Sequence, residues 1–247
     1  TNPDAQIEKN HLSGQDIQSK TYSYRNIGQM FLLYSSETNK YYHFGIDKSI
    51  MGGTRTDCYF DPVERAIHTN GSTLIYMSKA KVVNYDFLKE YDRYIKMCPE
   101  IHTEMVDDII EELKQYTGGN TSENGYYYSR FISLLRRGIV IHHGSMPLRT
   151  RTLVEKFVNN KLCRLCFSTS TLEQGINMPF DVVVLDRFEK SKPLAIKNLI
   201  GRAGRSSNKD DFDIGYVVVT SEANMANLRK ILLEDSRIKN YSSLDRQ

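Results

Sequence analysis

Two arginines in a glycine-rich turn are the residues of this sequence best suited to chemistry. Residues 198–205 read Asn-Leu-Ile-Gly-Arg-Ala-Gly-Arg, which puts Arg202 and Arg205 three positions apart. On a helical turn, side chains at this spacing can project in one direction, and the glycines allow close approach of backbone. Guanidinium groups match phosphate oxygens and stay charged at any working pH. The turn indicates phosphate chemistry, although a solvated basic helix end explains the motif alone equally well.

A hydroxyl-rich segment upstream could also bind phosphate. Residues 168–179 read Ser-Thr-Ser-Thr-Leu-Glu-Gln-Gly-Ile-Asn-Met-Pro and follow an apolar run typical of a buried strand. Such a turn offers hydroxyl and backbone N–H donors to a phosphate. Serine and threonine also favour helix N-caps, and the two roles are compatible because a helix N-terminus is itself an anion site.

The histidines and cysteines raise the question of a metal. His142 and His143 are adjacent, but no third ligand is evident, so we predict no metal site. Cys163 and Cys166 have the spacing of a metal or redox pair. We expect a strand over 162–167, where residues three apart point to opposite faces and the two sulfurs diverge. All four cysteines are therefore expected to be buried, structural thiols in a reducing cytoplasm.

Alternating strands and helices must position these residues. Short apolar runs predict strands at 73–77, 138–142, 163–168, 181–186 and 214–219. Apolar residues at three- and four-residue steps predict helices over about 83–95, 103–116, 126–137, 147–159, 193–205 and 222–235. Continuously apolar strands between helices indicate a mainly parallel sheet covered on both faces, an α/β three-layer sandwich. In such sheets function lies on loops at the carboxyl ends of the strands, where we expect the residues above.

Composition and patterning divide the chain into four segments. The polar residues 1–20 are expected to be a linker or poorly ordered lead-in, 21–71 a β-rich lead-in packing on the domain, 72–235 the main domain and 236–247 a tail. Apolar residues make up 40% of the chain and charged residues 26%, as in soluble globular proteins. The net charge of +3 permits nucleic-acid binding without arguing for it. No apolar run reaches the roughly 20 residues that span a bilayer, so no membrane partner is expected.

The order and spacing of the motifs resemble the C-terminal helicase domain of superfamily 2. The resemblance is to the DExH-type enzymes related to the Ski antiviral helicases and the archaeal repair helicases. It follows residues 134–144, 153–157, 167–179 and 201–205, and covers about 72–220. It implies a RecA-like (P-loop NTPase-like) fold, ATP with Mg²⁺ as cofactor, and DNA or RNA as partner.

On the nucleotide side, the resemblance implies that Arg202 and Arg205 are arginine fingers that reach the ATP γ-phosphate across a cleft. Gly175 and Asn177 would couple the nucleotide site to the nucleic-acid strand. Arg151 falls where the family commonly has an arginine that braces the arginine turn. The positions implied to support the turn are Arg151, Asn198, Gly201 and Gly204; Asn198 stands where the family usually has Gln or His.

On the nucleic-acid side, the resemblance implies contacts with the backbone. The implied residues are Ser78, His143, Gly144, Thr169 and Ser170. Segment 76–79 resembles motif IV of the family, and Thr169 would face a phosphate. Contacts to phosphates bind any sequence, which suits a translocating motor.

The sequence lacks the half of an ATP site that binds phosphates and metal. It holds no G-x-x-x-x-G-K-[ST] loop and no Asp-Glu-x-Asp/His element, and Gly52-Gly53-Thr54-Arg55 has neither the lysine nor the spacing. We therefore expect a second motor domain that works with an N-terminal RecA-like domain of the same parent protein and hydrolyses no ATP alone. Thr1 in place of Met favours this over a standalone RecA-like module that binds nucleic acid without turnover. An ordinary nucleotide-binding α/β enzyme is the third alternative, disfavoured because no G-x-G-x-x-G opens a helix.

Overall fold

One eight-stranded sheet organises the part of the chain described by the computed structural model, residues 28–46, 55–122, 128–169, 178–204 and 214–233. The strand order across the sheet is β3-β2-β1-β8-β7-β4-β6-β5. The strands are β1 (Gly28–Ser35), β2 (Lys40–His43), β3 (Thr56–Cys58), β4 (Thr73–Tyr76), β5 (Ile139–His142), β6 (Leu165–Ser168), β7 (Val182–Leu185) and β8 (Ile214–Val219).

The six strands from β1 to β5 in this order are parallel, and β2 and β3 add an antiparallel edge. The register aligns the carboxyl ends of the central strands. Ser168 at the end of β6 lies opposite both Tyr76 of β4 and His142 of β5. The loops that follow these three strands therefore leave the sheet at one edge.

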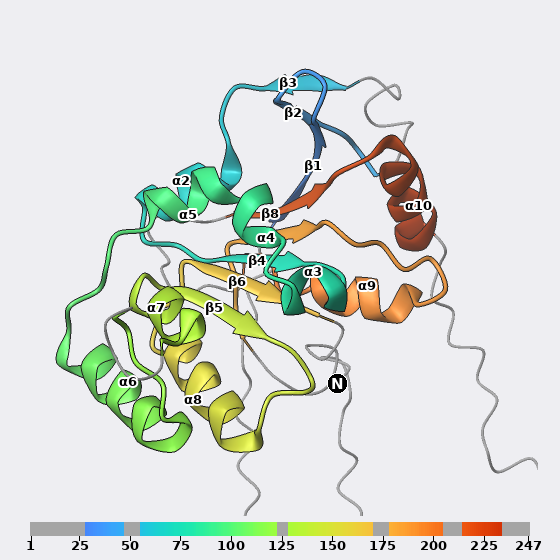
Figure 1. The fold of residues 1–247 in the computed structure, drawn as a ribbon. Coiled ribbons are helices and arrows are strands. Elements are labelled where there is room, and N and C mark those ends of the chain that lie inside the picture. The colour runs from blue at the N-terminus through green and yellow to red at the C-terminus, as the bar shows by residue number, and fades with distance from the viewer. Residues whose placement is uncertain (1–27, 47–54, 123–127, 170–177, 205–213, 234–247) are drawn as a thin grey trace, which may run out of the picture.

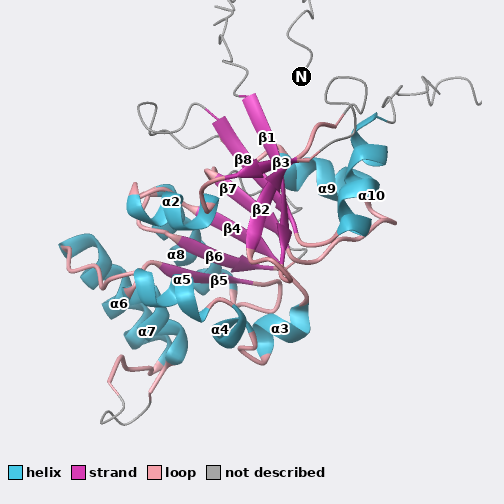
Figure 2. Ribbon diagram, turned by 90° about the horizontal axis from the view of Figure 1, so that it is seen from above, coloured by secondary structure: helices cyan, strands magenta, loops and turns pink. Residues whose placement is uncertain are grey.

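Helices cover both faces of the sheet (Figures 1 and 2). Successive β4 residues belong to different buried clusters, with Leu74 and Tyr76 in one and Ile75 in the other. The first cluster is completed mainly by α6 (Glu104–Thr117), α8 (Leu148–Asn159), α9 (Pro193–Ile200) and α10 (Glu222–Leu233). The second is completed mainly by α2 (Pro62–His68), α3 (Lys79–Val83), α4 (Phe87–Glu90) and α5 (Asp92–Met97), and α7 (Arg130–Arg136) contributes to both. The predicted three-layer α/β sandwich with a mainly parallel sheet is confirmed.

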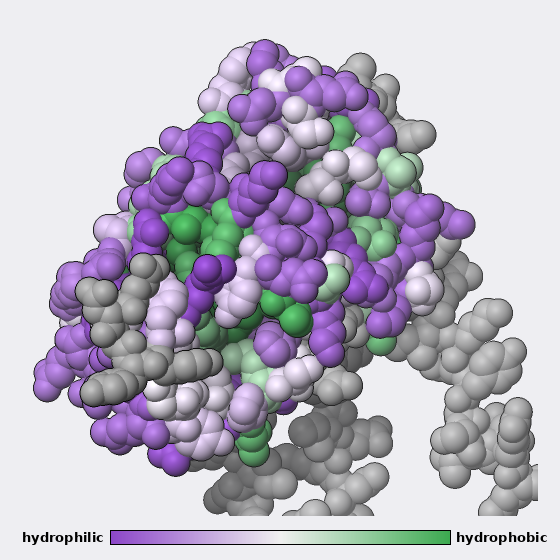
Figure 3. Space-filling model, in the orientation of Figure 1, coloured by the Kyte–Doolittle hydropathy of each residue, from purple (hydrophilic) through white to green (hydrophobic). Residues whose placement is uncertain are grey.

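The surface is mainly hydrophilic on the face drawn in Figure 3, with smaller hydrophobic areas between polar side chains. No helix in the residues that the structure describes is long and apolar enough to cross a membrane.

The continuous helix predicted over about 83–95 is wrong, because the chain forms three short helices there. Tyr85 adopts a φ of 59°, which a right-handed helix does not allow. The apolar spacing still identified core positions, since Phe87 and Ile95 are buried. Val83, however, is 51% exposed. The pattern therefore predicted which face is buried but not where the helix breaks.

The segment before residue 72 contributes strands to the same sheet. Its β1 pairs with β8 in parallel, with Leu32 opposite Val218, and both residues are in the same buried cluster. The segment also contains α2, which the sequence analysis missed. The predicted lead-in 1–20 and tail 236–247 lie outside the described residues.

The prediction that the sulfurs of Cys163 and Cys166 diverge is wrong. β6 begins only at Leu165, so Cys163 precedes the strand and the two-residue alternation does not apply to it. Both cysteines lie in one buried cluster, where Cys163 hydrogen-bonds with Cys166, and burial raises the pKa of the Cys163 thiol. All four cysteines are buried free thiols, as predicted.

Candidate functional site

Three of the predicted nucleic-acid residues come together at the carboxyl edge of the sheet. Ser78, His143 and Thr169 follow β4, β5 and β6, which are neighbours in the sheet. The strand pairing continues past the strand ends: the Met77 N–H donates to the Ser168 carbonyl (2.9 Å) and the Thr169 N–H to the His142 carbonyl (3.2 Å). The backbone thus fixes the start of all three loops relative to one another.

Ser78 caps the helix that follows β4. Its Oγ accepts a hydrogen bond from the Lys81 N–H (3.3 Å), so this serine is the N-cap of α3, a role that was not predicted from the sequence. A capping hydroxyl still has its own proton to donate. The side chain is half-buried, which leaves part of it at the surface of the loop.

The two histidines after β5 differ in burial but share a lowered pKa. His142 is fully buried, and burial, helped by the charges of Arg151, His143 and Arg202, lowers its pKa to about 4. Burial lowers the pKa of the half-buried His143 as well, together with the charges of Lys79 and Arg151. Both imidazoles are therefore neutral at neutral pH, and His143 could offer a ligand a hydrogen bond but no charge.

Arg151 of α8 holds the loop that contains Gly144. Its Nη2 donates to the Gly144 carbonyl (3.1 Å) and to the Met146 carbonyl (3.3 Å). The charges of Arg151 and Arg202 both act on the His142 imidazole, which puts the two guanidinium groups within electrostatic reach of one buried side chain. Bracing of the arginine turn by Arg151 stays a prediction.

The arginine turn lies at the other end of the sheet from these loops. Phe180, which precedes β7, donates from its N–H to the Arg202 carbonyl (3.1 Å) and accepts from the Gly204 N–H (2.7 Å). Gln29 near the start of β1 donates to the Ile200 carbonyl (2.9 Å). Our expectation that this turn follows a strand's carboxyl end is therefore wrong. The reason is that α9 is the crossover that returns the chain from the carboxyl end of β7 to the amino end of β8.

Glycines allow the arginine turn to pack tightly on the sheet. Gly201 ends α9, and its N–H donates to the Lys197 carbonyl (2.9 Å). Gly204 has a φ of 76°, a conformation that favours glycine. Gly215 of β8, which the sequence analysis missed, lies directly beneath: a Cβ there would be 2.5 Å from the Ala203 carbonyl carbon. Asn198 is exposed on α9.

Four predicted site residues lie outside the part of the chain that the structure describes. They are Ser170, Gly175, Asn177 and Arg205.

A group of charged residues at the carboxyl edge was not predicted from the sequence. Asp186, Arg187 and Glu189 follow β7, the neighbour of β4. The Arg187 N–H donates to the Tyr76 carbonyl (2.9 Å), and Lys81 pairs with Asp186 (3.0 Å). The available signal was the same as for the hydroxyl-rich turn, namely polar residues directly after an apolar strand.

Comparisons with known proteins match most of this region. A model of the family described as "Helicase conserved C-terminal domain" matches residues 59–207. The Hachiman protein HamB of Bacillus cereus is 28% identical over 48% of this chain, and the ATP-dependent DNA helicase Hel308 of Thermoplasma acidophilum is 25% identical over 52%. Superkiller complex protein 2 of Mus musculus is 34% identical over 29%. The matched parts cover only 11%, 21% and 6% of these relatives, respectively, so the chain spans a small part of each.

Proposed function

The chain belongs to the helicase conserved C-terminal domain family, in the Ski-like group of superfamily 2, and we propose that it is the second motor domain of an ATP-dependent nucleic-acid helicase. The first RecA-like domain of the same parent protein would bind ATP with Mg²⁺. The observation that carries the proposal is that the backbones of two sets of residues are anchored at opposite ends of the strands. Ser78, His143 and Thr169 gather at the carboxyl edge, while the Arg202 turn is fixed at the amino ends of β7 and β8.

Arg202 and Arg205 are proposed to act on the nucleotide. Phosphoryl transfer depends mainly on positioning and on stabilising charge, and an arginine finger can be worth about 10³–10⁵ in rate. A finger must be held rigidly to serve this purpose. The two hydrogen bonds between Phe180 and the 202–204 backbone, with Gly215 packed beneath, support this role because they fix the turn from which Arg202 projects.

The carboxyl edge is proposed to bind the nucleic-acid backbone. Thr169 and Ser170 would contact a phosphate from the end of β6, and Ser78, His143 and Gly144 would contribute from the two neighbouring strands. Because His143 is neutral at neutral pH, its contribution would be a hydrogen bond and not an ion pair. Gly175 and Asn177 lie in sequence between Ser170 and Phe180, which supports a coupling role between the two ends of the sheet.

The test of the proposal is ATP hydrolysis by the parent protein. We expect Arg202→Ala and Arg205→Ala each to lower the ATPase rate by about 10³-fold or more, because each removes charge that stabilises the transition state. Both variants should unfold at nearly the wild-type temperature. Arg93→Ala is the matched control, because Arg93 is an exposed arginine of α5 that pairs with Glu64. Normal hydrolysis by either finger variant would overturn the assignment.

A cytoplasmic location is proposed as well. Four buried, unbridged thiols support it, since a reducing compartment keeps thiols in this form.

A further inference from the structure

The loops after β4 and β7 are fixed to each other at the carboxyl edge of the sheet. Tyr76 and Leu185, the last residues of the two strands, lie opposite each other. Beyond them, the Arg187 N–H donates to the Tyr76 carbonyl (2.9 Å) and Lys81 pairs with Asp186 (3.0 Å). Arg187 therefore starts from a backbone position that is set by the strand leading to Ser78.

The Glu189 carboxylate orients the Arg187 side chain. Its Oε1 accepts from the buried Tyr76 hydroxyl (2.9 Å) and lies 3.1 Å from the Arg187 Nε, while its Oε2 lies 3.0 Å from the Lys192 Nζ. Burial raises the pKa of Glu189, but Lys192, Tyr76 and Arg187 together outweigh this and lower it. Glu189 is therefore a fixed anion whose side chain is only 15% exposed.

Arg187 keeps much of its binding capacity. Its side chain is 43% exposed, and within the described residues only Nε has a polar contact, so both terminal nitrogens can meet a ligand. Glu189 has two cations, Arg187 and Lys192, for one negative charge, which leaves this group positive overall. A second cation is not needed to neutralise Glu189, and exposed ion pairs contribute little to stability. The ion pair with Glu189 alone therefore does not explain why residue 187 is an arginine.

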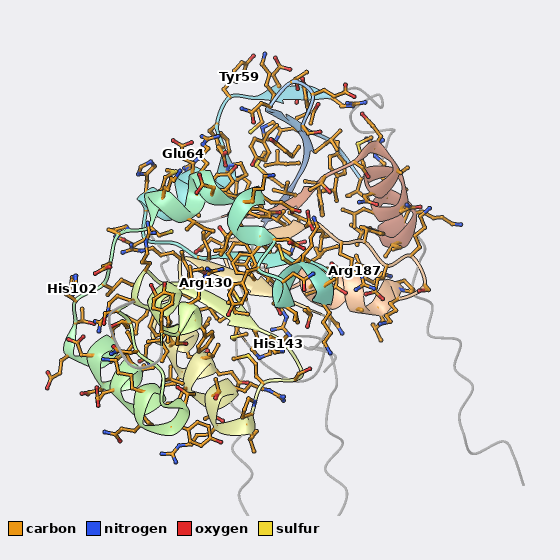
Figure 4. The ribbon with its side chains drawn as sticks, in the orientation of Figure 1. Tyr59, Glu64, His102, Arg130, His143 and Arg187 are labelled. Carbon is orange, nitrogen blue, oxygen red and sulfur yellow. The ribbon has the colours of Figure 1, made fainter. Side chains whose placement is uncertain are left out.

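The surroundings of Arg187 on the same edge are polar and of mixed charge: Asp186 and Glu90 pair with Lys81, and Lys79 adds a further cation. Lys79 is exposed just after Ser78, and its charge acts on His143. Figure 4 labels Arg187 and His143 in the part of the view where α3 lies, whereas Glu64, the partner of Arg93, lies on α2 in another part. A backbone phosphate held by Ser78 would thus meet an oriented guanidinium from the next strand.

We propose that Arg187 contacts a phosphate of the bound nucleic acid and that Glu189 is its positioning residue. The proposal rests on the proposed function, because it adds a contact to the same edge of the sheet. A guanidinium fork can give a phosphate two parallel hydrogen bonds, which requires a fixed orientation. Glu189 supplies that orientation while Lys192 compensates its charge.

The experiment measures binding of fluorescently labelled single-stranded DNA and RNA oligonucleotides to this chain across a range of salt concentrations. Arg187→Ala should weaken binding about tenfold, as for a lost charge-assisted hydrogen bond. It should also lower the slope of log affinity against log salt by about 0.7, as for one lost phosphate contact on a single strand. Arg93→Ala removes the same charge elsewhere and should change neither quantity to this extent. Thermal unfolding of each variant confirms that it is folded.

Glu189→Gln separates positioning from simple electrostatics. The substitution removes a negative charge, so electrostatics alone would tighten the binding of an anion. Positioning predicts the opposite, a loss of about threefold, because Arg187 is no longer oriented. Arg187→Lys should restore the salt slope but only part of the affinity, since a lysine lacks the fork.

The outcomes distinguish this proposal from the proposed function. If the wild-type chain binds and Arg187→Ala binds with the same affinity and salt slope, the contact is wrong and the helicase proposal stands. If Glu189→Gln binds more tightly, the positioning role is wrong. If the wild-type chain binds neither oligonucleotide at low salt, the nucleic-acid edge itself is wrong.

Discussion

At the residue scale, Gly215 sets how closely the arginine turn approaches the sheet. A Cβ at this position would lie 2.5 Å from the Ala203 carbonyl carbon and 2.5 Å from the Gly204 nitrogen. Backbone atoms cannot rotate away as a side chain can, so Gly215→Ala must displace the turn. We expect a loss of about 1–3 kcal/mol in the free energy of unfolding, measured by urea denaturation.

Gly28→Ala is the control for this prediction, because a Cβ at Gly28 would meet nothing within 4 Å. This variant should stay within about 0.5 kcal/mol of wild type. Equal stability of Gly215→Ala and Gly28→Ala would contradict the close packing of the turn. If the finger role of Arg202 is also correct, Gly215→Ala in the parent protein should reduce ATP hydrolysis, since it moves the turn without touching an arginine.

Also at the residue scale, the buried His142 makes the stability of the fold depend on pH. Its pKa is lowered from an ordinary value of 6.5 to about 4. Between these pH values the unfolded chain binds more protons at this residue than the folded one, so stability is fully present above pH 6.5 and falls as the pH drops towards 4. The expected loss is on the order of 2–3 kcal/mol for a fully buried imidazole.

Denaturation at pH 7 and pH 5 measures this effect. His142→Asn should show a smaller difference between the two pH values than wild type, because the titrating group is gone. His102→Asn is the control, since His102 is exposed, and it should keep the wild-type difference. An unchanged difference in His142→Asn would refute the assignment.

At the scale of elements, α2 depends on its N-cap. The Asp61 side chain accepts from the Val63 N–H (2.9 Å), the Glu64 N–H (3.1 Å) and the Tyr94 hydroxyl of α5 (2.6 Å). Asp61→Ala should therefore cost about 2 kcal/mol of stability, more than the roughly 1 kcal/mol of an average cap, because the half-buried Tyr94 hydroxyl also loses its acceptor.

Urea denaturation of Asp61→Ala beside Asp57→Ala tests this prediction. Asp57 is exposed on the edge strand β3, so its removal should be nearly neutral. A similar effect of the two substitutions would show that the cap does not stabilise the layer.

The sequence predicted the elements with strong periodicity and missed those set by local chemistry. The strands that precede Ser78, His143 and Thr169 were predicted because buried parallel strands are continuously apolar. The helix α2 was missed because its signal is a short cap, Asp61 followed by Pro62, and not a repeating pattern. The break at Tyr85 could not be predicted, since a positive φ at a tyrosine depends on tertiary packing and not on propensity.

The site was only partly predictable for a topological reason. The residue types of the arginine turn indicated phosphate chemistry, but they do not say at which end of the sheet the turn lies. That follows from the order β7, α9, β8, which places the end of the helix at the amino end of the next strand and was already contained in the predicted elements. Similarly, the proposed role of Arg187 depends on Glu189, whose position depends on a hydrogen bond with Tyr76. Tyr76 and Glu189 are 113 positions apart in the sequence. Local sequence patterns do not predict long-range pairs of this kind.

At the scale of the whole molecule, the backbones of the two sets of proposed site residues are anchored at opposite ends of one sheet, and the Arg202 charge reaches His142 at the carboxyl end of β5. Ser78, His143 and Thr169 are at the carboxyl edge, and the Arg202 turn is at the amino ends of β7 and β8. An oriented arginine acts in phosphoryl transfer only when phosphates and metal are held opposite it. This sequence has no phosphate-binding loop to do so. The 247-residue chain should therefore show no steady ATP hydrolysis, with or without an oligonucleotide.

A coupled assay for ADP release measures this directly. Adding a first RecA-like domain in the parent protein should restore turnover, and Arg205→Ala should abolish it there. Steady turnover by the isolated chain, lost in Arg205→Ala, would contradict the prediction, because it would mean that a complete nucleotide site lies within these residues. A trace of turnover that persists in Arg205→Ala would instead come from a contaminating enzyme, since it would not depend on the proposed finger.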